Sequence, residues 1–83
     1  MDPKLLHQKL ERIFQSVFDR SDLAINDEMT ADDVEGWDSL AQINLVVGAE
    51  DAFAVRFQTA EIKALKIVGQ FKSLIAGKLA AGR

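Results

Sequence analysis

Cysteine is absent from this chain of 83 residues, and histidine and tryptophan each occur once. Without cysteine, the chain has no disulfide framework, no thiolate zinc site and no cysteine nucleophile. The single histidine, His7, leaves no partner for a histidine-based catalytic pair or a histidine-rich metal site. These absences exclude most hydrolase chemistry. We therefore expect a protein that is not an enzyme, with no catalytic residue and no metal site of its own.

Long apolar runs are missing as well. No stretch approaches the roughly 20 consecutive apolar residues of a membrane-spanning helix. The first residues, Met-Asp-Pro-Lys, do not begin the basic-then-apolar pattern of a secretory signal. The basic residues are scattered and form no patch with interleaved aromatic residues, which argues against nucleic-acid binding. We expect a cytoplasmic monomer that neither spans a membrane nor binds nucleic acid.

The charges are divided unevenly along the chain, although the net charge is only −3. Residues 1–42 carry ten acidic and four basic side chains, whereas residues 43–83 carry three acidic and six basic ones. The acidic residues are concentrated between positions 19 and 38. This segment is either a solvated acidic loop or a docking surface for basic partners.

The hydrophobic pattern predicts helices and no strands longer than a few residues. Asp2 and Pro3 are typical of an N-cap and a first helical residue, and apolar residues then recur at helical spacing. Thr59 is a candidate cap for a brief helix. We expect three longer helices at about 3–18, 39–53 and 67–80 and a short one after residue 59. The length suits a single domain, residues 1–83, with an all-α fold: a small four-helix bundle.

The connection from residue 20 to residue 37 is long for so small a domain. Apolar residues are spaced along it as if to hold it against the core, namely Leu23, Ile25, Met29 and Val34. Thr30, with Asp33 three residues later, is typical of a capped single helical turn. Trp37 at its end is expected to anchor it against the bundle. A connection of this length is usually functional or well anchored.

The predicted helix 39–53 has two apolar faces. At about 100° per residue, one broad arc holds the expected core residues, which are Leu45, Val46, Ala49 and Phe53. A second stripe lies on the opposite side and consists of Leu40, Ile43 and Val47. A helix packed on one side needs only one such stripe. The second stripe is either covered by the connection 20–37 or exposed as a surface that docks a partner.

The segment Gly36-Trp37-Asp38-Ser39-Leu40 places a serine in the first turn of this helix, directly after a carboxylate. The unpaired backbone N–H groups and the positive end of the helix dipole meet at this position. They suit a covalently attached phosphate, although a serine at a helix start is also an ordinary cap. The residues alone leave both interpretations open for Ser39.

Residues 36–75 resemble the acyl carrier protein family, within the wider set of phosphopantetheine-binding carrier domains. Asp38-Ser39-Leu40 opens a helix, and Phe53 follows the serine by fourteen residues. Further matches continue in register, namely Leu45, Val46, Glu50, the extended 55–57, Glu61, Ile62, Leu65 and Val68. The resemblance implies a four-helix bundle of the acyl-carrier type.

The resemblance also implies a function for Ser39. A phosphopantetheinyl transferase would esterify it with a 4′-phosphopantetheine arm from coenzyme A, and Asp38 would assist that enzyme and its metal ion. The thiol of the arm would carry acyl groups as thioesters between acyl-transferring and ketosynthase-type enzymes. The positions expected to bind these partners are Leu40, Ile43, Val47 and Glu50.

Three positions differ from housekeeping fatty-acid carriers. Ala41 and Asn44 replace residues that are often acidic, and Gln58 replaces a frequent proline. These differences favour a specialised pathway, such as polyketide or modified-lipid synthesis, over ordinary fatty-acid synthesis. One alternative is an aminoacyl or peptidyl carrier, although such carriers more often have two glycines shortly before the serine. Another is an unmodified helical adaptor that binds a partner through the stripe.

Overall fold

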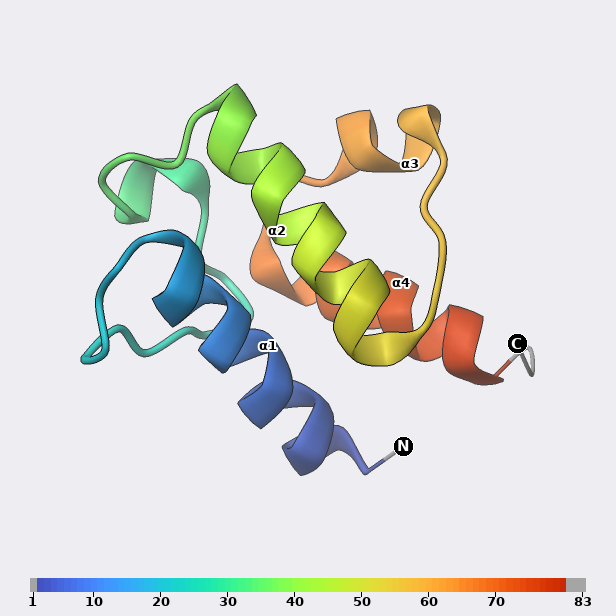
Figure 1. Ribbon diagram of the computed structural model, residues 1–83. Helices are drawn as coiled ribbons and strands as arrows, with labels where there is room; N and C mark the ends of the chain where they lie inside the picture. The colour runs from blue at the N-terminus through green and yellow to red at the C-terminus, as the bar shows by residue number, and fades with distance from the viewer. Residues whose placement is uncertain (1, 81–83) are drawn as a thin grey trace.

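The computed structural model describes residues 2–80 of the chain. Figure 1 shows helices joined by irregular segments. The order of elements is α1 (Pro3–Val17), the 3₁₀ turn η1 (Ala31–Asp33), α2 (Ser39–Phe53), α3 (Thr59–Ala64) and α4 (Val68–Ala80). The predicted all-α bundle with three longer helices and one short one is therefore confirmed. No helix among residues 2–80 has the length and apolar character that crossing a membrane requires.

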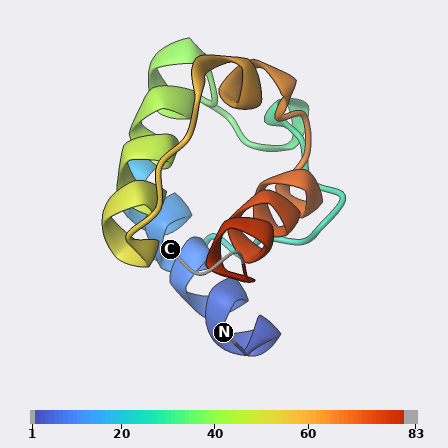
Figure 2. The same cartoon turned by 90° about the vertical axis from the view of Figure 1, so that its right-hand side faces the viewer.

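The three long helices enclose one hydrophobic core. Figure 2 shows α2 and α4 on opposite sides of the molecule, with α3 between them at one end. α1 contributes Leu6, Leu10 and Phe14, which are four residues apart and form one buried face. α2 contributes the four predicted core residues and also Ala41. From α4, the buried residues are Val68, Phe71 and Ile75.

Helix α1 begins where the sequence predicts. The carboxylate of Asp2 accepts a hydrogen bond from the N–H of Lys4 at 2.8 Å, and Pro3 is the first helical residue. Proline fits this position because its missing N–H would have had no partner inside the helix. The N-terminus of the bundle is thus fixed by local chemistry.

Buried apolar side chains and backbone hydrogen bonds hold the connection between α1 and α2 (Figure 1) against the bundle at several points. Leu23, Ile25 and Val34 are buried, as predicted. Thr30 caps η1, because its hydroxyl accepts the N–H of Asp32 at 3.2 Å. Two backbone hydrogen bonds from the start of α4 also reach the connection, Val68 N–H to Met29 O and Gly69 N–H to Asp27 O. These contacts fix the segment that leads into α2.

Two helix starts differ from the sequence prediction by one residue. Thr59 is the first residue of α3 and not its cap, because the N–H of Gln58 donates to the Glu61 carboxylate at 2.8 Å and makes Gln58 the cap. α4 begins at Val68 instead of residue 67, because Ile67 pairs with Thr30 in an isolated antiparallel bridge. Both corrections arise from hydrogen bonds that the hydrophobic pattern does not encode.

Helix α3 is the most loosely seated element. None of its residues is fully buried, and it spans only six residues. Its strongest link to the bundle is the ion pair between Glu61 and Lys78 of α4, at 3.0 Å. Hydrogen bonds from the Gln58 N–H and from Lys78 hold the pKa of Glu61 below its ordinary value of 4.5. α3 therefore depends more on polar contacts than the long helices do.

Candidate functional site

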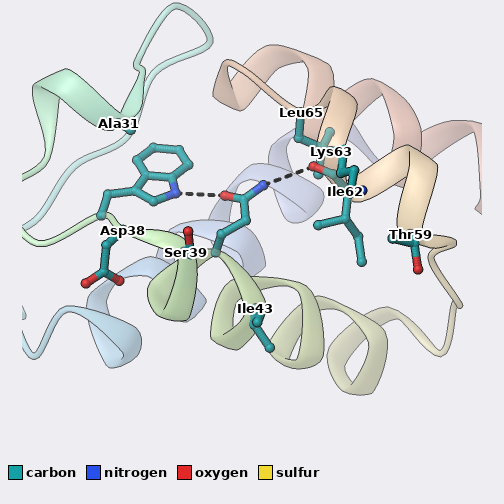
Figure 3. A pocket seen from close by; sticks show the side chains of 10 residues that line it. Ala31, Asp38, Ser39, Ile43, Thr59, Ile62, Lys63 and Leu65 are labelled. Carbon is teal, nitrogen blue, oxygen red and sulfur yellow. Dashed lines mark hydrogen bonds between the residues drawn. The ribbon is translucent and has the colours of Figure 1, made fainter.

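Ser39 is the first residue of α2 and is exposed to solvent. Asp38 is the N-cap, and its carboxylate accepts the N–H of Ala41 at 2.9 Å. Figure 3 shows this carboxylate pointing away from the Ser39 hydroxyl. Within residues 2–80, the hydroxyl makes no hydrogen bond to protein. The capping role therefore belongs to Asp38, and the hydroxyl of Ser39 is left accessible at the start of the helix.

A surface groove of about 740 Å³ adjoins Ser39, between α2, α3 and the end of the connection. Ligand sites in proteins commonly have volumes of 300–1,000 Å³. Its apolar lining comes from Trp37, Ile43, Ile62 and Leu65. Figure 3 shows these side chains and Ser39 around the same space. A group attached to the hydroxyl would therefore meet an apolar surface.

Trp37 joins the connection to the bundle, as the sequence predicts. Its ring lies edge-on to that of Phe14, with centroids 5.3 Å apart and an angle of 82° between the planes. Such T-shaped pairs are a favourable aromatic arrangement. The indole N–H donates to the side-chain oxygen of Gln42 at 2.8 Å. These contacts fix the backbone just before Asp38 and Ser39.

Gln42 is a site residue that sequence reasoning did not identify. Its amide nitrogen donates to the carbonyl oxygen of Ile62 at 3.4 Å, so its side chain connects Trp37, α2 and α3 (Figure 3). The one feature of the sequence that could have pointed to Gln42 is its position four residues after Asp38, one helical turn into α2. The α3 partner is twenty residues away in sequence, so the pattern alone gives no reason to select Gln42.

The second stripe of α2 is open. The exposed fractions of Leu40, Ile43 and Val47 are 66%, 54% and 48%. The first of the two interpretations, in which the connection 20–37 covers this stripe, is therefore wrong. Leu23, Ile25 and Val34 of the connection are buried in the core instead. Backbone hydrogen bonds fix its first residue on α1 and its middle on the start of α4. An apolar stripe thus lies on the surface beside Ser39.

Glu50 differs from the three stripe residues. It is half-buried, and its carboxylate accepts the N–H of Phe57 at 3.0 Å. This bond fastens the extended segment after α2 to the helix. The structure thus gives Glu50 a local anchoring contact, whereas the stripe residues project freely.

Four acidic side chains are exposed in the segment that leads to Ser39. Asp32, Asp33, Glu35 and Asp38 are all exposed in the segment that precedes α2. Within the described part of the chain, no three histidine, cysteine or acidic side chains lie together in a way that could hold a metal ion. Of the four, Asp38 lines the groove, and none belongs to a preassembled metal centre among the described residues.

Comparison with known proteins gives matches among solved structures. No family model matches the chain, and no curated protein does. Among solved structures, the solution NMR structure of a holo acyl carrier protein from Geobacter metallireducens has a TM-score of 0.83 and 36% sequence identity. The match covers 90% of this chain and 86% of that one. At this identity and coverage, the chain belongs to the acyl carrier protein family and is a carrier, not an enzyme.

Proposed function

We propose that this chain carries acyl groups as thioesters on a 4′-phosphopantetheine arm esterified to Ser39. The observation that supports this most directly is the accessible hydroxyl at the first position of α2, free of protein hydrogen bonds among residues 2–80. The matched structure from Geobacter metallireducens is a holo carrier, which supports the same modification here. A separate phosphopantetheinyl transferase adds the arm from coenzyme A.

The residues present fit such an arm. The backbone N–H groups of Ser39 and Leu40 make no hydrogen bond within the described residues, and they belong to the first turn of α2. Together with the helix dipole, they favour a phosphate group on Ser39. The groove next to Ser39 offers the arm apolar walls. The bound arm supplies the thiol on which acyl groups travel, and the chain itself has none.

Asp38 has two tasks in this proposal. One of its oxygens accepts the N–H of Ala41 and fixes the start of α2. The carboxylate is exposed beside Ser39, so it also assists the transferase and the metal ion that the transferase brings. These tasks are compatible because a carboxylate has two oxygens and several lone pairs.

The stripe of Leu40, Ile43 and Val47 is proposed as the docking surface for ketosynthase-type and acyl-transferring enzymes. It is apolar, exposed and continuous with Ser39 along one face of α2. Residues 39–49 contain no charged side chain. This composition favours partners that meet α2 with apolar contacts, as in a specialised polyketide or lipid pathway. Glu50 and the acids before Ser39 are proposed to contribute at the border of the surface.

Co-expression with a phosphopantetheinyl transferase followed by intact-mass analysis tests the attachment. We expect the mass to increase by one phosphopantetheine group on the wild-type chain and not on the Ser39→Ala variant. Ser73→Ala, which alters an exposed serine on α4, is the matched control and should still be modified. An unmodified wild-type chain, or a mass gain that persists in Ser39→Ala, would contradict the proposal.

Two further assays separate the alternatives. Incubation of the holo chain with adenylating enzymes and, separately, with acyl-transfer enzymes distinguishes an aminoacyl or peptidyl carrier from an acyl carrier. An unmodified adaptor would lose partner binding in Val47→Glu and keep it in Ser39→Ala. The acyl carrier hypothesis instead requires Ser39 for every transfer reaction.

A further inference from the structure

The side chain of Gln42 links three segments that meet beside Ser39. Its oxygen accepts the indole N–H of Trp37 at 2.8 Å, and its nitrogen donates to the backbone oxygen of Ile62 at 3.4 Å. An indole N–H can only donate and a carbonyl oxygen can only accept, so this orientation of the amide is the one that satisfies both groups. We call this pair of hydrogen bonds the Gln42 bridge.

The Gln42 bridge crosses the space between α2 and α3. Gln42 of α2 and Ile62 of α3 both line the groove next to Ser39. Leu45, one turn beyond Gln42 on α2, is fully buried in the core. A chain attached at Ser39 that passes from the groove toward the core between these helices must therefore displace the amide. Displacement would leave the part-buried indole N–H and Ile62 carbonyl without their protein partners, which is unfavourable.

The bridge matters because α3 has few polar contacts with the other helices, although Ile62 also packs against the core. No residue of α3 is fully buried. Besides the bridge, the polar link of α3 to another helix among residues 2–80 is the ion pair of Glu61 with Lys78 of α4. Gln42 is therefore the side chain of α2 that donates a hydrogen bond to α3 near Ser39.

We propose that Gln42 is a specificity-determining residue of this carrier: the Gln42 bridge keeps an attached chain in the surface groove and out of the interior. The inference rests on the proposed function, because it concerns the group that Ser39 carries. It implies cargo that lies along Ile43, Ile62 and Leu65 and stays accessible to partner enzymes. A long acyl chain would be stabilised by burial in the core, but the closed Gln42 bridge prevents that burial.

The absence of cysteine allows a direct test that needs no transferase. In Ser39→Cys the new thiol is the only one in the chain, so N-ethylmaleimide and N-octylmaleimide each attach at position 39 alone. The three proteins to compare are Ser39→Cys, Ser39→Cys with Gln42→Ala, and Ser39→Cys with Asn44→Ala. Asn44 is an exposed polar residue of the same helix and serves as the matched control. Isotope-filtered NOE spectra then locate the octyl methyl group.

With the bridge intact, the octyl methyl should contact Ile43 or Ile62, and the octyl and ethyl adducts should have the same melting temperature. In the Gln42→Ala background, the methyl should contact Leu45 or Val68. The octyl adduct should then melt about 4 °C or more above the ethyl adduct, because apolar surface becomes buried. The Asn44→Ala background should behave like Ser39→Cys alone.

Gln42→Glu provides a second variant in case Gln42→Ala does not fold. It retains an acceptor for Trp37, loses the donor to Ile62 and places a carboxylate against that carbonyl, so it should open the same path. Core contacts of the octyl methyl with the bridge intact would overturn the inference. The inference would also be overturned if the octyl methyl contacted only surface residues in both Gln42 variants. Neither result depends on enzymatic modification of Ser39, so failure of the proposed function and failure of this inference are distinguishable.

Discussion

A Cβ atom on Gly48 would lie 2.8 Å from Cγ2 of Ile13, so α1 and α2 approach each other too closely for a larger residue at this position. Glycine inside a helix costs about 1 kcal/mol relative to alanine. Here the glycine allows the two longest helices to pack closely, which offsets that cost. The contact lies on the side of α2 that faces α1. It therefore helps to fix the rotation of α2, so that the stripe beside Ser39 faces solvent.

Gly48→Ala should destabilise the protein although alanine is the better helix former. Forcing an extra methyl group into a packed contact costs about 1–3 kcal/mol, which exceeds the gain in helix propensity. Gly77 in α4 is the matched control, because among the described residues no side chain and no other segment lies within 4 Å of its added Cβ. Gly77→Ala should raise the stability by about 1 kcal/mol. Urea denaturation of both variants measures the two effects.

A double-mutant cycle with Ile13→Ala checks the cause. If the methyl group of Ile13 is the obstacle, Gly48→Ala should be much less harmful in the Ile13→Ala background. Equal effects of Gly48→Ala in both backgrounds would show that the contact is not responsible.

The two proposed roles of Asp38 are separable by substitution. Asp38→Asn keeps a side-chain oxygen for the Ala41 N–H, so the stability should stay within about 0.5 kcal/mol, whereas Asp38→Ala should lose about 1 kcal/mol. Both variants should be modified by the transferase at least tenfold more slowly, because both lack the carboxylate. Thermal melts and a time course of intact mass give the two readouts. Full modification rates in Asp38→Asn would limit Asp38 to capping.

The helices and the core were largely predictable because their signals are local. Asp2 followed by Pro3 marks the start of α1, and the apolar spacing on α2 identifies its buried residues. The position of Ser39 in the first turn of α2 was also predictable, but the residues alone did not decide whether Ser39 or Asp38 caps the helix. Each of these features depends on residues within one or two helical turns of one another.

The remaining features depend on contacts between distant segments. The exposure of the stripe could not be decided from the sequence, because it depends on where the connection 20–37 lies. The close approach at Gly48 requires Ile13, which is on another helix. The Gln42 bridge requires a backbone oxygen of α3, and any residue type at position 62 would supply one. The sequence therefore predicts where the helices begin and end better than how they are arranged relative to one another.

Val47→Glu tests the stripe as a docking surface. The side chain is about half exposed, so the stability should change by no more than about 0.5 kcal/mol. Modification by the transferase, or transfer to a partner enzyme, should fall at least tenfold, which corresponds to about 1.4 kcal/mol. Leu5→Glu on α1 is the control, because Leu5 is exposed to a similar degree, 44%, outside the stripe. Equal losses in both variants would point to a general charge effect and against a docking site.

The ion pair that fastens α3 makes the stability depend on pH in a defined direction. The Lys78 ammonium lies 3.0 and 3.1 Å from the two carboxylate oxygens of Glu61, and the Gln58 N–H also donates to this carboxylate. These contacts favour the ionised form, so the pKa of Glu61 is lower in the folded chain than its ordinary value of 4.5. The unfolded chain therefore takes up the proton first as the pH falls.

Glu61→Gln should accordingly lower the melting temperature most at neutral pH. The contribution of Glu61 is complete above pH 4.5 and disappears as the pH falls through the lower pKa of the folded chain, so the wild-type and variant curves should converge there. Thermal melts between pH 7 and pH 2.5 measure the difference. Glu28→Gln is the control, because the Glu28 carboxylate makes no hydrogen bond among the described residues, and its difference from wild type should be smaller at neutral pH. A Glu61→Gln difference that stays constant down to the lowest pH would mean that the charge of Glu61 does not stabilise α3. In that case the position of α3 would depend on its apolar contacts and on the Gln42 bridge.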